Sequence, residues 1–391
     1  MKIRIMFVDD DSKMLAGLQK RFRGMRNEWE MTFVGSGREA LENLQREPFH
    51  VLVTDMRMPE MDGTELLRRV EKLYPQIVRI IVSENSDAEM ILKTAGPAHQ
   101  FLHKPCEAGK LKMAVARAGA MRSLLENEAL INLISGIESL PSLPSLYTEV
   151  INEANSPNGS LNKVGEIISK DVGMSAKILQ LVNSPFFGLP SHVNSPVRAV
   201  RLLGLETIKS LILSVKIFSQ FNRSGLPGFP ISRLWNHSIA TGIIARGIAT
   251  QKDSGQNRID EAFMAGLLHD VGKLILVDRL PQQYLEITAM EKSLRCPLWE
   301  AEQKVLGTTH AQVGAYLMGI WGLSESIVET LAYHHYPSRC PNKSFSTLSA
   351  VHLANSIEHE SSTGSSENRL DFEYLEKLGI DDQGRDMAGT A

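Results

Sequence analysis

The segment Val51-Leu-Val-Thr-Asp-Met-Arg-Met-Pro-Glu-Met-Asp-Gly63 decides the fold of the first part of this chain. It begins with a short apolar run rich in β-branched side chains, which predicts a buried strand. Asp55 ends this strand, and the helical pattern Gly63–Leu73 follows after a short link. The segment therefore predicts a unit that places a carboxylate at the carboxyl end of a strand.

The same alternation of strand and helix patterns extends from the start of the chain to about residue 120. The other predicted strands are Ile3–Val8, Met31–Val34, Ile77–Val82 and Gln100–His103. The other predicted helices are Ser12–Arg23, Gly37–Arg46, Asp87–Thr94 and Glu107–Ala120. Such strand-then-helix units with short links predict a doubly wound parallel α/β sheet with helices on both faces.

The composition is that of a soluble protein with two or three domains. The chain has 391 residues, of which 43% are hydrophobic and 22% charged, and its net charge is −3. This balance does not indicate nucleic acid or a membrane as a partner. Cys106, Cys296 and Cys340 are too far apart for a disulfide framework or a thiolate metal site. The sequence lacks the apolar stretch of a signal peptide or a membrane span, so we expect a cytoplasmic protein.

Three carboxylates fall at the predicted carboxyl ends of the first and third strands. Asp9 and Asp10 follow the first strand, and Asp55 ends the third. Ligands of an open parallel sheet gather at this edge, so the carboxylates converge if the two strands are neighbours. Such a cluster repels itself unless a hard cation neutralises it, and Mg²⁺ with oxygen ligands fits that role. Taken singly, acids at strand ends are ordinary solvated loop residues.

A hydroxyl and an ammonium group fall at the ends of the fourth and fifth strands. Ser83 ends the fourth strand, and Lys104, followed by Pro105, ends the fifth. Both groups can hold the oxygens of a phosphoryl group placed on a neighbouring carboxylate. Together with the three carboxylates, they predict a phosphoryl-transfer site.

Residues 1–120 resemble a receiver domain of two-component signalling. Phe7-Val-Asp-Asp-Asp11 is similar to the acid pocket of that family, and Val53–Gly63 to its phosphorylation loop. The resemblance implies a flavodoxin-like sheet of strand order 2-1-3-4-5. It also implies that a sensor histidine kinase or a phosphotransfer protein donates phosphate to Asp55. The further roles it implies are Mg²⁺ coordination by Asp9, Asp10, Asp55 and the Arg57 backbone carbonyl, switching by Ser83 and Phe101, and phosphoryl contact by Lys104.

Strand patterns stop at about residue 121, and the chain is predicted to be helical from there to about Tyr336. Glu107–Leu140 contains no proline and predicts one unbroken helix that leaves the first domain. Further helices are predicted at Leu161–Ser169, Ser175–Asn183, Leu205–Phe221, Leu234–Thr250, Asp260–Val277, Leu298–Val305, Ala311–Trp321 and Ser324–His334.

The end of the chain has a different character. Glu360–Asn368 is rich in Ser, Glu and Gly and is expected to be a mobile loop, followed by a short helix at Arg369–Leu378. We therefore expect four parts: a first domain at 1–120, a linker helix at 121–138, a helical domain at 139–340 and a helical extension at 341–391.

Imidazoles and a carboxylate recur in the helical part of the chain. They are His237, His269, Asp270, His310, His334 and His335. Such a set can hold one or two transition metals that activate water. The alternative is that the histidines cap helices and satisfy buried carbonyls, and the residues alone leave the two interpretations close to even.

Residues from about Ile137 to Pro337 resemble the HDOD family, a branch of the HD phosphohydrolase superfamily. The resemblance rests on Leu140-Pro-Ser-Leu-Pro144, Ala262–Lys273, Trp321-Gly-Leu323 and His334-His-Tyr-Pro337. It implies an all-α regulatory domain without demonstrated hydrolase activity. Catalytic HD enzymes carry a further aspartate on a later helix, where this chain offers the neutral Asn355. The Gly-Tyr-Pro element of cyclic di-GMP phosphodiesterases is also missing.

Three functions compete on these grounds. The leading one is a bacterial-type response regulator in which phosphorylated Asp55 gates an HDOD module that binds a downstream signalling protein. A homodimer through the fourth helix, fifth strand and fifth helix is a further option. The second is a metal-dependent phosphohydrolase acting on a cyclic dinucleotide or another nucleotide second messenger. The third is a DNA-binding regulator using Leu161–Asn183, which is the weakest because its second helix has one Lys and no Arg.

Overall fold

The computed structural model describes residues 2–380 apart from several gaps. The longer gaps are 84–96, 105–107, 184–191, 205–218, 221–230 and 364–369, and shorter ones occur between 123 and 158, at 253–254 and at 343. The predicted helix Asp87–Thr94 and most of the predicted helix Leu205–Phe221 therefore lie outside the described residues.

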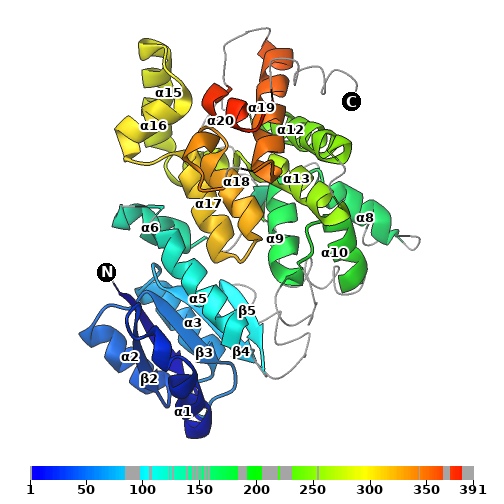
Figure 1. Ribbon diagram of the computed structural model, residues 1–391. Helices are drawn as coiled ribbons and strands as arrows, with labels where there is room; N and C mark the ends of the chain where they lie inside the picture. Colours follow the sequence, from blue (N-terminus) through cyan, green and yellow to red (C-terminus); the bar gives the residue numbers. More distant parts are fainter. Residues whose placement is uncertain are drawn as a thin grey trace.

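The first domain is a parallel sheet covered by helices (Figure 1). Its strands are β1 (Ile3–Val8), β2 (Trp29–Val34), β3 (Val51–Asp55), β4 (Val78–Ser83) and β5 (Gln100–His103). Its helices are α1 (Ser12–Arg21), α2 (Gly37–Arg46), α3 (Gly63–Leu73) and α5 (Ala108–Arg122), with a 3₁₀ turn at Arg23–Met25. The strands lie in the order β2-β1-β3-β4-β5, which confirms the predicted doubly wound fold.

Side-chain alternation along the strands explains why both faces of the sheet are covered. Phe7 of β1 packs in the same core cluster as Leu111 of α5. Its neighbour Met6 points to the opposite face and packs in a second cluster with Leu66 of α3. A central strand buried on both faces must be apolar throughout, which is the reason for the continuous hydrophobic runs in the sequence.

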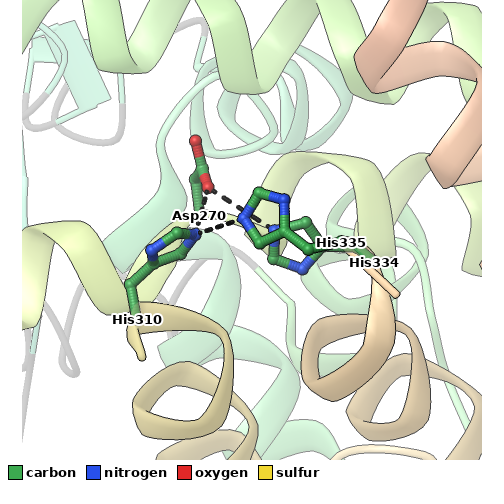
Figure 2. Close-up of side chains that lie close together, drawn as sticks. All are labelled: Asp270, His310, His334 and His335. Carbon is green, nitrogen blue, oxygen red and sulfur yellow. Dashed lines mark hydrogen bonds and ion pairs between the residues drawn. The ribbon is translucent and has the colours of Figure 1, made fainter. Parts of the chain in front are cut away.

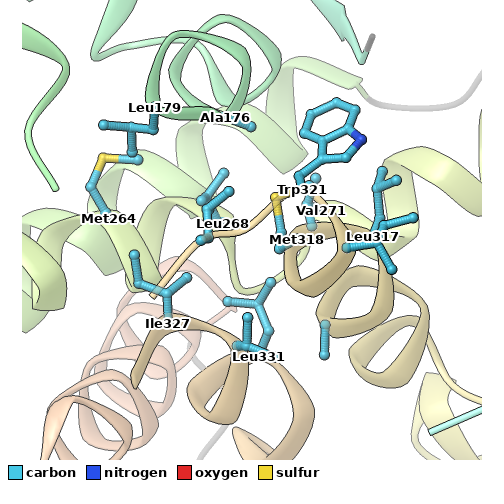
Figure 3. Close-up of a cluster of buried hydrophobic side chains, with 14 of the residues drawn as sticks. Ala176, Leu179, Met264, Leu268, Val271, Leu317, Met318, Trp321, Ile327 and Leu331 are labelled. Atoms are coloured by element: carbon cyan, nitrogen blue, oxygen red, sulfur yellow. The ribbon is translucent and has the colours of Figure 1, made fainter. Parts of the chain in front are cut away.

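The second domain is a helical bundle. Its first helices are α6 (Glu128–Ser135), α8 (Leu161–Ile168), α9 (Val172–Val182), α10 (Pro196–Leu203), α12 (Ile231–Gln251), α13 (Gln256–Leu268) and α14 (Val271–Arg279). They are followed by α15 (Pro281–Leu294), α16 (Leu298–Leu306), α17 (His310–Ile320), α18 (Glu325–Tyr333), a 3₁₀ turn (Pro337–Arg339), α19 (Thr347–Thr363) and α20 (Phe372–Lys377). Figure 3 shows the core of this bundle, where α9, α13, α17 and α18 meet around Leu268 and Met318.

The bundle is not purely α-helical. β6 (Pro141–Ser142) pairs in parallel with β7 (Ser219–Gln220), and β7 occupies the end of the predicted helix Leu205–Phe221. Proline restricts its own φ and lacks an N–H, so Pro141 favours an extended segment over a helix. The predicted all-α domain therefore needs this small correction.

The predicted unbroken helix Glu107–Leu140 is wrong. Helix α5 ends at Arg122, and α6 begins only at Glu128. The side chain of Asn127 accepts hydrogen bonds from the backbone N–H groups of Ala129 and Leu130, which caps a new helix at that point. The predicted linker helix at 121–138 is thus a helix end, a turn and a second short helix.

Two further predicted elements differ from the structure. The predicted helix Asp260–Val277 is split at His269 and Asp270 into α13 and α14. The predicted loop Glu360–Asn368 begins within α19, which continues to Thr363. The predicted short helix Arg369–Leu378 is present as α20. The split after α13 depends on tertiary contacts that helical periodicity does not reveal.

The two domains are in contact through α5 and β5 on one side and α17 on the other. Gln100 Nε2 donates a hydrogen bond to the carbonyl oxygen of Ile320 (3.1 Å), and Arg117 donates one to that of Leu323 (2.9 Å). Met121 lies directly against Gly319, where a Cβ would meet its sulfur at 2.2 Å. The Ile320 carbonyl belongs to the last residue of α17, and Leu323 lies in the link between α17 and α18.

A second, buried contact joins the start of β4 to α6. His99 Nδ1 accepts a hydrogen bond from the Arg79 backbone N–H (3.0 Å), and its Nε2 lies 2.8 Å from the carbonyl oxygen of Ser135. Burial, together with the neighbouring Arg79 guanidinium, holds the pKa of His99 well below its ordinary value. The neutral ring therefore donates from Nε2 to Ser135, whose hydroxyl lies 2.8 Å from the Tyr316 hydroxyl of α17.

The contact between α14 and α17 can be tested through Gly272. A Cβ at this position would lie 1.9 Å from the carbonyl oxygen of His310, so Gly272→Ala must move one helix against the other. We expect a loss of about 1–3 kcal/mol in the free energy of unfolding of the helical domain, measured by urea denaturation. Gly17→Ala is the control, because a Cβ there meets no described atom within 4 Å. Gly17→Ala should stabilise α1 by about 1 kcal/mol. An unfolding midpoint for Gly272→Ala at or above that of the wild type contradicts the close packing.

Candidate functional site

The acidic cluster of the first domain forms as the strand order requires. Because β1 and β3 are paired in parallel, with Val8 opposite Thr54, the carboxylates that follow them lie at the same edge of the sheet. Ligand oxygens of Asp9, Asp10 and Asp55 lie within 4.8 Å of one another. This grouping of oxygen ligands suits a hard divalent cation such as Mg²⁺.

Lys104 connects two of these carboxylates. Its Nζ lies 2.8 Å from Asp9 Oδ2 and 2.8 Å from Asp55 Oδ1, and all three side chains are nearly buried. Burial lowers the pKa of Lys104, but the hydrogen bonds to Asp55 and Asp9 outweigh it and the pKa is raised. Burial raises the pKa of Asp55, and the contact with Lys104 offsets this only in part. The lysine therefore stays charged beside a carboxylate that is destabilised by desolvation.

Backbone hydrogen bonds hold the remaining predicted residues around Asp55. The Lys104 N–H donates to the carbonyl oxygen of Ser83 (2.7 Å), and the Ser83 hydroxyl contacts Met56 Sδ at 3.5 Å. Gly63 approaches so closely that a Cβ would lie 2.1 Å from the carbonyl oxygen of Asp55, so only glycine fits there.

The last two predicted receiver residues lie near this site in the chain. Arg57 is exposed in the loop after β3. Phe101 lies on β5, but its side chain is outside the described residues. The predicted switch role of Phe101 therefore stays a prediction.

A cavity of about 350 Å³ borders this cluster. Asp9, Asp55 and Lys104 line its polar end, and Leu15 and Leu18 of α1 line its apolar end. The predicted phosphoryl-transfer residues are therefore reachable from a hollow between α1 and the sheet.

The histidines of the second domain come together from separate elements. His237 lies on α12, and His269 and Asp270 fill the break between α13 and α14. His310 is the first residue of α17, and His334 and His335 follow the end of α18. Figure 2 shows Asp270, His310, His334 and His335 pointing toward one another. All six predicted residues thus belong to one cluster.

Asp270 lies at the centre of the cluster, and its two carboxylate oxygens face different histidines. Oδ1 lies 3.2 Å from His310 Nε2 and 3.8 Å from His334 Nε2. Oδ2 lies 3.4 Å from His269 Nε2 and 3.6 Å from His237 Nε2. His335 Nε2 lies 2.9 Å from His310 Nε2. The ligand atoms thus form two groups that share Asp270.

The outer nitrogens of these imidazoles are held by acceptors. His269 Nδ1 lies 2.7 Å from the carbonyl oxygen of Gly266, and His334 Nδ1 lies 2.8 Å from that of Leu331. A proton on Nδ1 leaves the Nε2 lone pair pointing into the cluster. The outer nitrogens therefore satisfy carbonyls, as the alternative interpretation expects. The inner nitrogens face one another, and the metal site stays a prediction.

Two glutamates and a lysine complete the cluster and were missed in the sequence. Glu302 lies 2.7 Å from His310 Nδ1, and Glu358 contacts His237 Nδ1. Lys273 Nζ lies 2.6 Å from Asp270 Oδ2. Glu358 lies on α19 one turn after Asn355, so the later helix does supply a carboxylate, but at another position. The spacing of three residues on one helix was the available signal for Glu358.

Electrostatics favour cations at the centre of the cluster. Burial lowers the pKa of His269 to about 4, although Asp270 opposes the shift. Burial also lowers the pKa values of His334 and His335 to well below the ordinary range. Burial raises the pKa of Asp270, but His269 and Lys273 outweigh it and hold the pKa well below its usual value. Neutral imidazoles around an ionised carboxylate are the donor set of a transition metal.

His310 differs from the other buried imidazoles of the cluster. Burial lowers its pKa, but the neighbouring carboxylates of Glu302 and Asp270 outweigh burial, and the pKa is raised. A carboxylate beside the outer nitrogen makes the ring a stronger base at its inner nitrogen. His310 is therefore the most basic donor that the cluster offers to a cation.

Two buried polar atoms of the cluster also favour a bound cation. Within the described part of the chain, Asp270 Oδ1 and His334 Nε2 are buried without a hydrogen-bond partner. A buried polar atom of this kind is rare in folded proteins and requires an explanation. A metal ion between these two atoms would satisfy both, so the residues fit a metal.

Comparison with known proteins identifies both domains. The response regulator receiver domain family matches residues 5–116, and the HDOD domain family matches residues 140–337, about half of the chain. The chain belongs to the HDOD family and carries an N-terminal receiver domain. This confirms both predicted resemblances, and the domain order is that of a response regulator.

Relatives cover parts of the chain. An uncharacterized protein of Treponema pallidum (strain Nichols) is 27% identical over 219 residues, covering 56% of this chain and 42% of that protein. The luminescence regulatory protein LuxO of Vibrio campbellii (strain ATCC BAA-1116) is 32% identical over 101 residues, covering 26% of this chain and 22% of LuxO. The chain thus spans less than half the length of either relative.

A solved structure shares the fold of a large part of the chain. The MmoQ response regulator from Methylococcus capsulatus (strain Bath) aligns with a TM-score of 0.50 and 22% identity, covering 64% of this chain and 97% of MmoQ. At this identity the likeness shows the fold alone. Among the described residues, no helix has both the length and the apolar character needed to cross a bilayer.

The raised pKa of Asp55 predicts a pH-dependent effect on stability. The folded protein binds a proton at Asp55 more tightly than the unfolded chain, so the ionised carboxylate destabilises the receiver at neutral pH. This destabilisation disappears as the pH falls through the raised pKa. We expect Asp55→Asn to increase the free energy of unfolding at about pH 7 and to lose this gain towards about pH 4, measured by urea denaturation. Asp62→Asn is the control, because Asp62 is an exposed helix cap and asparagine caps equally well. If Asp55→Asn is less stable than the wild type at neutral pH, the pKa of Asp55 is not raised as described.

Proposed function

We propose that this chain is a response regulator in which phosphorylation of Asp55 gates the HDOD domain. The observation that carries the proposal is the contact of Lys104 Nζ with both Asp9 and Asp55 at the carboxyl edge of the sheet. A sensor histidine kinase or a phosphotransfer protein is the proposed donor. The Asp55 carboxylate attacks the phosphorus of a phosphohistidine, an O–P bond forms as the N–P bond breaks, and the released imidazole takes up a proton.

The residues around Asp55 have separate proposed roles in this transfer. Lys104 and the Ser83 hydroxyl hold oxygens of the phosphoryl group, whose charge they partly neutralise. Asp9, Asp10, Asp55 and the Arg57 backbone carbonyl are the proposed ligands of Mg²⁺, which supplies further neutralisation when bound. Gly63 keeps the loop close to Asp55, as its contact with the Asp55 carbonyl supports.

The proposed gate is the contact of the receiver with α17. Ser83 is hydrogen-bonded to the backbone of Lys104 directly after β5, and Gln100 of β5 reaches the carboxyl end of α17. Movement of Ser83 and Phe101 toward a phosphoryl group would therefore shift a strand that the HDOD domain contacts. This direct route does not need the unbroken helix that the sequence predicts at Glu107–Leu140.

The contact also bears on the predicted homodimer. The predicted dimer face consists of the fourth helix, β5 and α5. Its fourth helix lies outside the described residues, and β5 and α5 contact α17 of the same chain. We propose that this face serves the intramolecular contact before phosphorylation and becomes available for a downstream protein or a second copy afterwards. Such a change needs an element with two arrangements, and the polar contacts of Gln100 and Arg117 are weak enough to exchange.

For the HDOD domain we propose metal binding with a regulatory role. The proposed ligands are His237, His269 and Asp270 at one position, and Asp270, His310, His334 and His335 at the other. Such metals supply structural cross-linking when bound. A protein partner is favoured over hydrolysis of a nucleotide messenger for two reasons. Asn355 stands where an aspartate is expected, and Lys273 pairs with the carboxylate of Asp270 that hydrolysis would need.

Labelling of the purified chain tests the acceptor. Incubation with a small acyl phosphate and Mg²⁺ should add one phosphoryl group, detected by intact mass. Asp55 is the expected acceptor because it lies against Lys104 and pairs with Val82, the residue before Ser83. Asp55→Asn should abolish the labelling, and the exposed control Asp62→Asn should leave it unchanged. Labelling that persists in Asp55→Asn shows that another residue is the acceptor.

Hydrogen exchange tests the gate. A phosphoryl mimic bound at Asp55 should speed amide exchange in α5 and at the carboxyl end of α17. Arg117→Ala should speed amide exchange in the same segments without the mimic. The substitution removes a half-buried hydrogen bond to Leu323 worth about 1–3 kcal/mol. The exposed Arg23→Ala is the matched control and should have no effect. If the mimic changes exchange only within the receiver, the proposed route through α17 is wrong.

A further inference from the structure

Two glutamates lie behind the histidine cluster, one on each side of Asp270. Glu302 lies on α16 and is fully buried, and its Oε2 accepts a hydrogen bond from the backbone N–H of His310 (2.8 Å) and lies 2.7 Å from His310 Nδ1. Glu358 lies on α19 with its side chain 13% exposed and contacts His237 Nδ1. Each glutamate thus holds one imidazole from the outside.

The buried carboxylate of Glu302 is held by a single residue. Its Oε1 has no hydrogen bond within the described part of the chain, and its Oε2 contacts the ring and the backbone amide of His310. A buried anion of this kind is costly unless a cation lies near. A metal bound to His310 Nε2 would be that cation. It would lie on the opposite side of the imidazole ring from Glu302, in the carboxylate–histidine–metal arrangement.

The same pattern occurs on both sides of Asp270. On the Oδ1 side, His310 is held by Glu302 and His334 by the Leu331 carbonyl. On the Oδ2 side, His237 is held by Glu358 and His269 by the Gly266 carbonyl. Each side of Asp270 therefore has one imidazole held by a carboxylate and one held by a carbonyl oxygen. A repeated arrangement around one shared carboxylate is not expected for histidines that only fill a core.

The two sides differ in the number of ligands. Each side has one half-buried imidazole, His335 or His237, among buried ligands. The Oδ1 side offers four ligands and the Oδ2 side three. On the Oδ2 side Lys273 Nζ, 2.6 Å from Asp270, competes with any cation for the carboxylate. Four protein ligands are typical of structural sites, and three protein ligands with an open position are typical of exchangeable ones.

We infer that Glu302 and Glu358 are positioning residues for two unequal transition-metal positions, a tighter four-ligand one supported by Glu302 and a weaker three-ligand one supported by Glu358. This inference rests on the metal binding proposed above. The four-ligand position uses Asp270 Oδ1, His310, His334 and His335, and the three-ligand position uses Asp270 Oδ2, His237 and His269. Neutralising either glutamate weakens its own position while the protein stays folded.

The full-length chain titrated with Co²⁺ tests this inference. Visible absorption reports the ligand field at each position, and elemental analysis after dialysis gives the number of bound ions. We expect two binding steps in the wild type. Glu302→Gln should weaken the tighter step by about 10–100-fold and change its absorption band, and Glu358→Gln should do the same to the weaker step. Glu360→Gln, an exposed change two residues further along α19, should leave both steps unchanged.

The possible outcomes separate the inference from the proposed metal binding. A wild type that binds no Co²⁺ contradicts both. Two wild-type steps that are unchanged in Glu302→Gln and Glu358→Gln, with circular dichroism showing folded protein, contradict the inference alone. If the buried Glu302→Gln variant does not fold, the less buried Glu358→Gln decides: selective loss of the weaker step supports the inference, and no change overturns it.

Discussion

The burial of helix α17 is the constraint on which the rest of the molecule depends. Every residue of this helix except Gln312, in its first turn, is buried. Its first residue, His310, belongs to the histidine cluster, and its last residue, Ile320, accepts the hydrogen bond of Gln100 from the receiver. A helix packed on all sides moves as a rigid body, so a displacement of one end also moves the other end.

The packing of α17 explains two glycines and the break in the neighbouring helix. Gly272 lets α14 approach the backbone of His310, and Gly319 lets α5 place Met121 against the other end. Because α14 begins directly after Asp270, the same close contact sets the distance between Asp270 and His310. The geometry of the cluster and the docking of the receiver are thus two consequences of one helix position.

Both sites bury carboxylates, and the groups that balance the negative charge differ between them. In the receiver, buried carboxylates are held beside one ammonium group, that of Lys104, and remain reachable from a cavity. In the helical domain, Asp270 is buried among imidazoles, most of which have pKa values lowered by burial, with Lys273 as a close ammonium group. The first arrangement suits transient charge on a phosphoryl group, and the second suits a permanently bound cation.

The sequence by itself determined the receiver sheet and its acidic edge. Parallel strands end at a common edge, so residues that follow strands, such as Asp9, Asp55 and Lys104, are brought together by strand order alone. Only the tertiary structure decided the contacts of Glu302 and Glu358 and the break at His269. Helical periodicity shows which face of a helix is buried but not which helix lies against it, and a bundle has no common edge that aligns its side chains.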